Sequence, residues 1–177
     1  TDLVAGTIEA VTEITKFGGI CVLPRFDAAQ LASLITLRLN IFTDPQKPIQ
    51  VEPKIYPIGE PDADSPVFVT TNFSLTYFTV EGEVERSKVS CYISVVDTEG
   101  LGVLNAYAGD KLSAEKVIKA LADQGVADKV KHRKLIIPGL LPVFRAEIED
   151  TSDWKEVIIG PENASGIPAF LAEHWKN

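Results

Sequence analysis

Small, neutral and hydroxyl-bearing residues gather in the turns that follow four short apolar runs of the sequence. Such turns present hydroxyls and backbone N–H groups to a large ligand, but they contain few groups that transfer protons. The same residue types are common in ordinary turns, so spacing alone leaves a binding edge and plain turns as equal alternatives. The residues concerned are Thr70, Thr71, Asn72, Ser74, Thr76, Thr98, Gly100, Gly102, Asn105, Gly139, Ser165 and Gly166.

Other arrangements that carry chemistry are weak or missing in this sequence. Asp97 and Glu99 form an acidic pair that suits either catalysis or the cap of a following helix. Neither His132 nor His174 falls in one of the four turns, so no Ser–His–acid set is indicated. The glycine patterns of dinucleotide sites and P-loops do not occur, which disfavours both kinds of site.

The two cysteines, Cys21 and Cys91, each lie in an apolar run. They form no CxxC pair, so no zinc or iron–sulfur site is visible in this sequence. We expect both to behave as small core residues.

The four apolar runs predict strands of a parallel sheet. They cover 67–69, 91–96, 134–137 and 157–159, and each ends in small or polar residues. An α/β unit with four or five parallel strands is expected from about residue 64 to 177. Ligands bind outside the carboxyl ends of such strands, where the four turns would meet.

Helical patterns separate the predicted strands. Asn72 and Ser74 are both suitable N-caps for the first helix, which Gly82 is expected to shorten or interrupt, and Ser113 caps a later one. The helices are predicted over 74–80, 101–107, 113–122, 140–149 and 164–175.

The first part of the chain has a different organisation. A helix over 1–15, a short strand over 20–23 and a helix capped by Asp27 are incomplete without further strands. The segment 43–66 contains six prolines and predicts a semi-rigid connector, with possible short strands at 50–51 and 54–56. Because the chain starts at Thr1 and not at a methionine, we expect it to be a fragment of a larger polypeptide, with processing of the N-terminus as the alternative.

Charge and hydropathy restrict the class of protein. The net charge of −8 over 177 residues disfavours nucleic-acid binding, and no apolar run is long enough to span a membrane. A cytoplasmic protein is expected.

Five segments together resemble the large (gamma) subunit of the corrinoid iron–sulfur protein of the carbon monoxide dehydrogenase/acetyl-CoA synthase system. They are 36–53, 69–78, 97–100, 132–139 and 160–168, and the resemblance extends over essentially the whole chain. It implies that residues 1–60 are the end of a TIM-like barrel plus a proline-rich connector. It further implies that 61–177 form a flavodoxin/Rossmann-like corrinoid-binding domain.

The resemblance also implies a function. A corrinoid (a cobamide with its cobalt) would accept a methyl group from methyltetrahydrofolate through a methyltransferase and pass it to acetyl-CoA synthase. The implied partners are the small subunit, that methyltransferase, acetyl-CoA synthase and a reductive activator ATPase. The iron–sulfur cluster would belong to a missing N-terminal part. The alternatives are a flavodoxin-like domain that binds flavin or nucleotide, and a docking module without a ligand.

The loop after Val96 departs from a pattern common among corrinoid carriers. Many use D-x-H-x-x-G to place a histidine under the cobalt, but here Asp97 is followed by Thr-Glu-Gly-Leu-Gly. We therefore expect no histidine ligand from this loop and no catalytic residue or metal ligand in the chain. The helix over 101–106 is expected below the corrinoid, with Leu104 or Asn105 nearest the cobalt. This adds Leu101, Val103 and Leu104 to the expected cofactor-binding residues.

Overall fold

The computed structural model describes residues 2–17, 22–23, 25, 27–41 and 48–175. The chain divides into two compact units, Thr1–Pro48 and Ile49–Asn177, which are described separately. In the described part of the chain, no helix has the length and apolar character needed to cross a membrane.

The N-terminal unit contains two helices that pack against each other, α1 (Leu3–Phe17) and α2 (Ala28–Ile41). As predicted, Asp27 caps α2: its Oδ1 accepts a hydrogen bond from Gln30 N at 2.8 Å. Gln30 Oε1 accepts in return from Asp27 N at 3.2 Å. This reciprocal pair satisfies two backbone donors at the start of the helix. The strand expected over 20–23 lies mostly outside the described residues.

The C-terminal unit is built on a five-stranded sheet in the order β1-β3-β2-β4-β5. The four strands β2 to β5 are parallel to one another, whereas β1 pairs with β3 in the antiparallel direction. This confirms a mixed α/β unit with a mostly parallel sheet. The strands are β1 (Ile55–Ile58), β2 (Val67–Thr71), β3 (Cys91–Val96), β4 (Lys134–Ile137) and β5 (Glu156–Ile159).

Strand β1 lies inside the proline-rich segment that the sequence predicts to be a connector. Its register pairs Pro57 with Tyr92 of β3. Since β1 is at the edge of the sheet and has one neighbour, a residue without an N–H group is tolerated there. The short strand predicted over 54–56 is therefore present, shifted to Ile55–Ile58.

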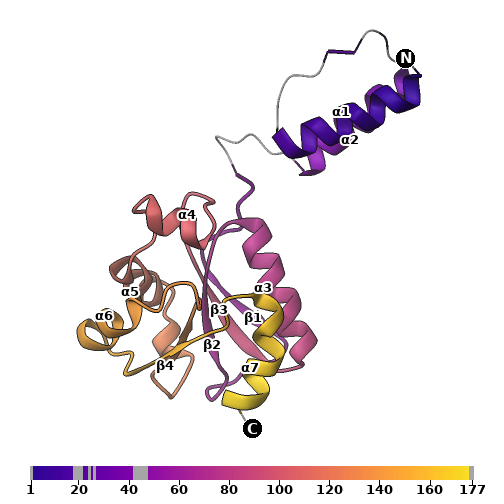
Figure 1. Ribbon diagram of the computed structural model, residues 1–177. Coiled ribbons are helices and arrows are strands. Elements are labelled where there is room, and N and C mark those ends of the chain that lie inside the picture. The colour runs from indigo at the N-terminus through magenta and orange to yellow at the C-terminus, as the bar shows by residue number, and fades with distance from the viewer. Residues whose placement is uncertain (1, 18–21, 24, 26, 42–47, 176–177) are drawn as a thin grey trace. The chain divides into compact units, whose positions relative to one another are not determined.

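Helices cover both faces of the sheet, with α3 and α7 on one side and α5 and α6 on the other (Figure 1). Val67 and Val69 belong to the core under α5 and α6, whereas Phe68 belongs to the core under α3 and α7. Burial on both faces explains why the central strands are apolar throughout. The helices are α3 (Ser74–Ser87), α4 (Val103–Ala108), α5 (Ala114–Asp123), α6 (Phe144–Thr151) and α7 (Ile167–His174), with short 3-10 turns η1 (Val126–Asp128) and η2 (Ala164–Gly166).

Helix α3 differs from its prediction at its start and in its middle. It runs without a break through the exposed Gly82, because the buried Tyr77 and Val84 pack against the sheet and outweigh the helix propensity lost at one glycine. Its N-cap is Phe73, which makes no side-chain capping bond. Ser74 is the first helical residue, and the side chain of Asn72 bonds elsewhere. The prediction of Ser113 as N-cap is confirmed, since its side chain accepts a hydrogen bond from Lys116 N.

Candidate functional site

A cleft of about 520 Å³ opens at the carboxyl ends of β2 and β4. The connection from β2 leads to β3 on one side of β2, and the connection from β3 leads to β4 on the other. The crevice at such a reversal of strand order is where open α/β sheets bind ligands. The cleft volume falls within the usual range for small-molecule sites.

Four parts of the C-terminal unit line this cleft. Strands β2 and β4 contribute Phe68, Val69, Thr70, Ile136 and Ile137, and α3 contributes Leu75, Thr76, Thr79 and Val80. The start of α4 contributes Gly102, Val103, Leu104 and Asn105. The segments after β4 and β5 contribute Pro138, Leu140, Gly160, Pro161, Glu162, Asn163, Ala164 and Ile167.

Of the residues predicted from the sequence, those that line the cleft are Thr70, Thr76, Gly102, Val103, Leu104 and Asn105. Sequence reasoning missed the contribution of α3 beyond Thr76. Leu75, Thr79 and Val80 follow at helical spacing on the face that contains Thr76, and this periodicity was the available signal.

The cleft is mainly apolar, and Glu162 is the only charged residue among those that line it. Three apolar side chains of the lining are unusually exposed: Leu75 at 66%, Leu104 at 53% and Leu140 at 39%. Grouped exposed apolar side chains mark a surface that a ligand or partner covers. Apart from Glu162, the polar side chains of the lining are hydroxyls and amides, so the cleft suits a large ligand with little charge.

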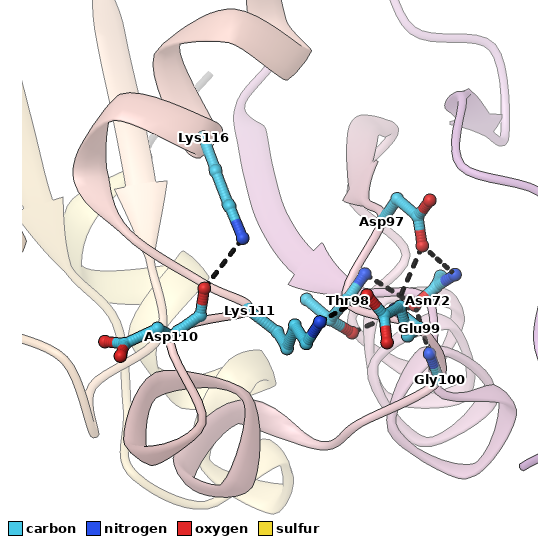
Figure 2. A network of polar contacts seen from close by, with 8 residues as sticks. All are labelled: Asn72, Asp97, Thr98, Glu99, Gly100, Asp110, Lys111 and Lys116. Carbon is cyan, nitrogen blue, oxygen red and sulfur yellow. Dashed lines mark hydrogen bonds and ion pairs between the residues drawn. The ribbon is translucent and has the colours of Figure 1, made fainter. Parts of the chain in front are cut away.

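Asn72 follows β2 directly and is almost completely buried. Figure 2 shows its side chain at the centre of a polar network. Its Oδ1 accepts hydrogen bonds from the backbone N–H groups of Thr98 at 2.9 Å and Gly100 at 3.0 Å. Its Nδ2 donates to Asp97 Oδ1 at 3.0 Å and to Gln50 Oε1 at 3.2 Å. Asn72 therefore connects the end of β2 with the loop after β3.

The loop after β3 has an unusual backbone. Glu99 and Gly100 both have left-handed conformations, with φ of 57° and 79°. Asp97 Oδ1 also accepts from Glu99 N at 3.0 Å, and Lys111 Nζ forms an ion pair with Glu99 Oε1 at 2.6 Å (Figure 2). Helix α4 has Gly102 as its N-cap and no side-chain cap, so of the two alternatives for the acidic pair, the cap of the following helix is not found.

Two predicted glycines lie in close backbone packing: Gly139 where the loops after β4 and β5 cross, and Gly166 within the segment after β5. A Cβ on Gly139 would come within 2.3 Å of Gly160 O, and one on Gly166 within 2.9 Å of Pro161 Cβ. Both glycines therefore allow close packing beside the cleft, and neither lines it. The other predicted residues outside the lining are Thr71, Asn72, Ser74, Thr98, Gly100, Leu101 and Ser165.

Both histidines lie outside the cleft lining, as predicted. His132 precedes β4; its Nδ1 accepts a hydrogen bond from Lys134 N at 3.2 Å, so its Nε2 donates to Ser65 O at 2.9 Å. His174 lies in the last turn of α7. The described residues include no group of three or more side chains suited to hold a metal ion.

Cys91 is fully buried, as predicted for a core residue, and burial raises the pKa of its thiol to about 12. Burial and the hydrogen bond to Glu81 also raise the pKa of Tyr77. Both groups lie in the core under α3, away from the cleft lining. We assign them no role in the site.

Comparison with known proteins places the chain in a family. Residues 2–171 match the family described as CO dehydrogenase/acetyl-CoA synthase delta subunit. The chain is 48% identical over 164 residues to the corrinoid/iron-sulfur protein large subunit of Moorella thermoacetica, covering 92% of this chain and 36% of that protein.

Archaeal proteins show a similar relationship. The acetyl-CoA decarbonylase/synthase complex subunit gamma of Archaeoglobus fulgidus is 41% identical, covering 92% of this chain and 34% of that protein. Its counterpart from Methanocaldococcus jannaschii is 40% identical, covering 98% of this chain and 36% of that protein. The chain thus spans about a third of the length of these relatives. These matches confirm the resemblance found in the sequence motifs, and the chain belongs to the CO dehydrogenase/acetyl-CoA synthase delta subunit family.

Proposed function

We propose that the C-terminal unit binds a corrinoid and that the chain is part of a methyl-group carrier in the CO dehydrogenase/acetyl-CoA synthase system. The observation that carries this proposal is the apolar, nearly uncharged cleft at the reversal of strand order between β2 and β4. Its lining includes six residues that were expected to bind the cofactor: Thr70, Thr76, Gly102, Val103, Leu104 and Asn105. The name of the Moorella relative, a corrinoid/iron-sulfur protein, supports the same assignment.

The residues of the cleft fit this group chemically. A corrinoid combines a broad, largely apolar macrocycle with neutral amide side chains at its rim. Exposed leucines such as Leu104 and Leu140 offer apolar surface to the ring, and the hydroxyls of Thr70 and Thr76 and the amide of Asn105 offer partners for the rim amides. The lining contains no histidine, which supports the expectation that no histidine of this chain binds the cobalt.

A cobamide is larger than the 520 Å³ of this cleft, so part of it would extend beyond the walls. The exposed leucines at the mouth would then meet a further surface. We propose that this surface is the small subunit of the corrinoid iron–sulfur protein.

When bound, the cobamide supplies a cobalt atom that accepts and releases a methyl group. The residues of this chain bind it, orient it and keep water from its apolar face. We further propose a cytoplasmic carrier whose partners include a methyltetrahydrofolate methyltransferase, acetyl-CoA synthase and a reductive activator ATPase. In the same proposal, the end of a TIM-like barrel lies in the N-terminal unit, before the proline-rich segment that carries β1, and the iron–sulfur cluster lies outside this chain. Family membership supports these details.

The proposal is tested by titrating the chain with hydroxocobalamin and, separately, with flavin mononucleotide, while recording absorption spectra. Saturable binding of the corrinoid and none of the flavin is expected. Flavin binding alone would favour the flavodoxin-like alternative, and binding of neither, also when the small subunit is present, would refute a corrinoid site in this chain.

Two variants locate the binding site. Leu104→Glu places a charge on the cleft wall and should weaken corrinoid binding by about tenfold or more, because the charge would lose water next to an apolar ring. Val143→Glu is the matched control, since Val143 is 62% exposed, similar to the 53% of Leu104, but does not line the cleft. Equal affinities for both variants would show that the corrinoid binds elsewhere.

A further inference from the structure

The first turn of α4 forms one wall of the cleft, through Val103, Leu104 and Asn105. Helix α4 has six residues, and no side chain caps its N-terminus. A helix this short has little stability of its own, so the chain on either side must fix its position. The preceding segment is the loop with two left-handed residues, Glu99 and Gly100.

Asn72 stabilises this loop in its strained conformation. Its Oδ1 accepts from the backbone N–H groups of Thr98 and Gly100, which lie on either side of Glu99. Thr98 Oγ1 is close to two acceptors, Asn72 Oδ1 at 2.9 Å and Leu101 O at 2.8 Å. The hydroxyl has one hydrogen atom, so it donates to only one of these two acceptors at a time. Without Asn72, two buried N–H groups would lose their acceptor, and left-handed Glu99 would lose support.

The segment that begins the C-terminal unit contacts the same residue. Val51 N donates to the backbone O of Asn72 at 2.9 Å, and Ser74 N donates to Ile49 O at 3.0 Å. Between these bonds, Gln50 Oε1 accepts from Asn72 Nδ2 at 3.2 Å. Together with Asp97, Gln50 therefore fixes which way the Asn72 amide faces.

We propose that Asn72 is the positioning residue of the cleft: it sets the α4 wall through the loop after β3, and Gln50 and Asp97 orient its amide. Asn72 itself does not line the cleft, so it acts on a ligand through Leu104 and its neighbours. The inference rests on the proposed function only for the identity of that ligand.

Hydrogen exchange measures the proposed role without any ligand. In Asn72→Ala, the amides of Thr98, Gly100 and Ala106 should exchange at least about tenfold faster than in the unmodified chain. Gln124→Ala is the matched control, since Gln124 also bonds β3, by accepting from Ser94 Oγ at 2.7 Å and donating to Val95 O at 2.9 Å. It should leave these three amides at their original rates. Gln50→Ala removes one bond at an exposed residue and should give a smaller acceleration of the same amides.

Rescue by exchange of side chains separates positioning from a general loss of stability. Asn72→Asp replaces the N–H donor that faces Asp97 with a second carboxylate, so both exchange protection and hydroxocobalamin affinity should fall. Adding Asp97→Asn restores one amide and one carboxylate with their places exchanged. The double variant should recover part of both properties, since the bond between residues 72 and 97 returns while Glu99 N loses the carboxylate oxygen that it shares with Asn72.

The outcomes distinguish this inference from the proposed function. Unchanged protection of Thr98 and Gly100 in Asn72→Ala and Gln50→Ala would overturn the inference, as would no rescue in the double variant. Lost protection with full retention of corrinoid affinity would also overturn it, because the loop would then not set the wall. If the unmodified chain binds no hydroxocobalamin even with the small subunit present, the proposed function fails, while accelerated exchange in α4 and rescue by the double variant would still support the positioning role.

Discussion

Replacing Gly139 with alanine tests how closely the loops after β4 and β5 cross beside the cleft. Gly139 is buried, and an added Cβ would lie 2.3 Å from Gly160 O, 2.6 Å from the carbonyl carbon of Pro161 and 2.7 Å from Glu162 N. All three are backbone atoms, so no side-chain rotation relieves the contact. The two loops must separate, or β4 and β5 must shift.

The expected cost follows from this geometry. Overfilling a packed core by one methyl group typically costs about 1–3 kcal/mol. Three backbone contacts below 3.0 Å place Gly139→Ala at the upper end of that range, at about 3 kcal/mol. Since Pro138, Leu140 and Gly160 line the cleft next to the crossing, ligand binding should weaken as well.

Gly82→Ala is the matched control. Gly82 lies exposed inside α3, and an added Cβ would meet no atom within 4 Å. The same chemical change should therefore stabilise the chain by about 0.5–1 kcal/mol, since alanine favours a helix interior over glycine.

Urea unfolding followed by tryptophan fluorescence is the appropriate assay. The two tryptophans of the chain, Trp154 and Trp175, both belong to the C-terminal unit, so the signal reports that unit. The urea midpoint should fall for Gly139→Ala and rise for Gly82→Ala. A midpoint for Gly139→Ala equal to that of the unmodified chain would refute the close crossing.

Two further substitutions test buried groups. Folding raises the pKa of the Cys91 thiol from 9.0 to about 12. The contribution of the neutral thiol to the free energy of unfolding is therefore complete below pH 9 and is lost as the pH rises from 9 towards 12. Between about pH 9 and pH 11, the free energy of unfolding should fall more steeply for the unmodified chain than for Cys91→Ala, by up to about 1.4 kcal/mol per pH unit; parallel curves would contradict this. Thr71 is fully buried, and its Oγ1 has no hydrogen-bond partner among the described residues. Thr71→Val should raise the free energy of unfolding by about 1 kcal/mol, and the urea midpoint with it, whereas a lower midpoint would show that the hydroxyl has a bonding partner in the folded protein.

The parallel part of the fold could be predicted from the sequence because its strands are short, apolar and separated by clear helical patterns. Strand β1 is less obvious, because it contains Pro57 and is fixed by its pairing with β3. The continuity of α3 through Gly82 could not be predicted from the residues of the helix alone, because it depends on the packing of that helix against the sheet. Sequence patterns within a segment predicted the strands and helices that depend on their own residues. They did not predict the bounds of elements that depend on tertiary contacts.

The site shows the same division. Thr70 lies near the carboxyl end of β2 and Thr76 in the first part of α3, and both line the cleft, as the rule for parallel strands predicts. Asn72 lies between them and was expected to cap α3, but its side chain bonds residues 25 to 28 positions later in the chain. As a helix cap, an asparagine uses its Oδ1 as an acceptor and leaves its Nδ2 without a partner. The loop after β3 instead offers two N–H groups to the Oδ1 and a carboxylate to the Nδ2. A buried amide takes the arrangement that satisfies all its groups.

The charge of the lining bears on which ligand the cleft admits. Glu162 is the only charged residue among those that line it, and it forms no ion pair within the part of the chain that the structure describes. A phosphate next to Glu162 would meet repulsion without a compensating lysine or arginine from the lining. A neutral ring with amide substituents meets no such penalty, and amide N–H groups can donate to the carboxylate. Glu162→Gln should therefore leave hydroxocobalamin affinity within a fewfold of the original if only the ring and its amides lie near this residue. A large gain in affinity would instead place the phosphate of the corrinoid tail, or that of a nucleotide, against Glu162.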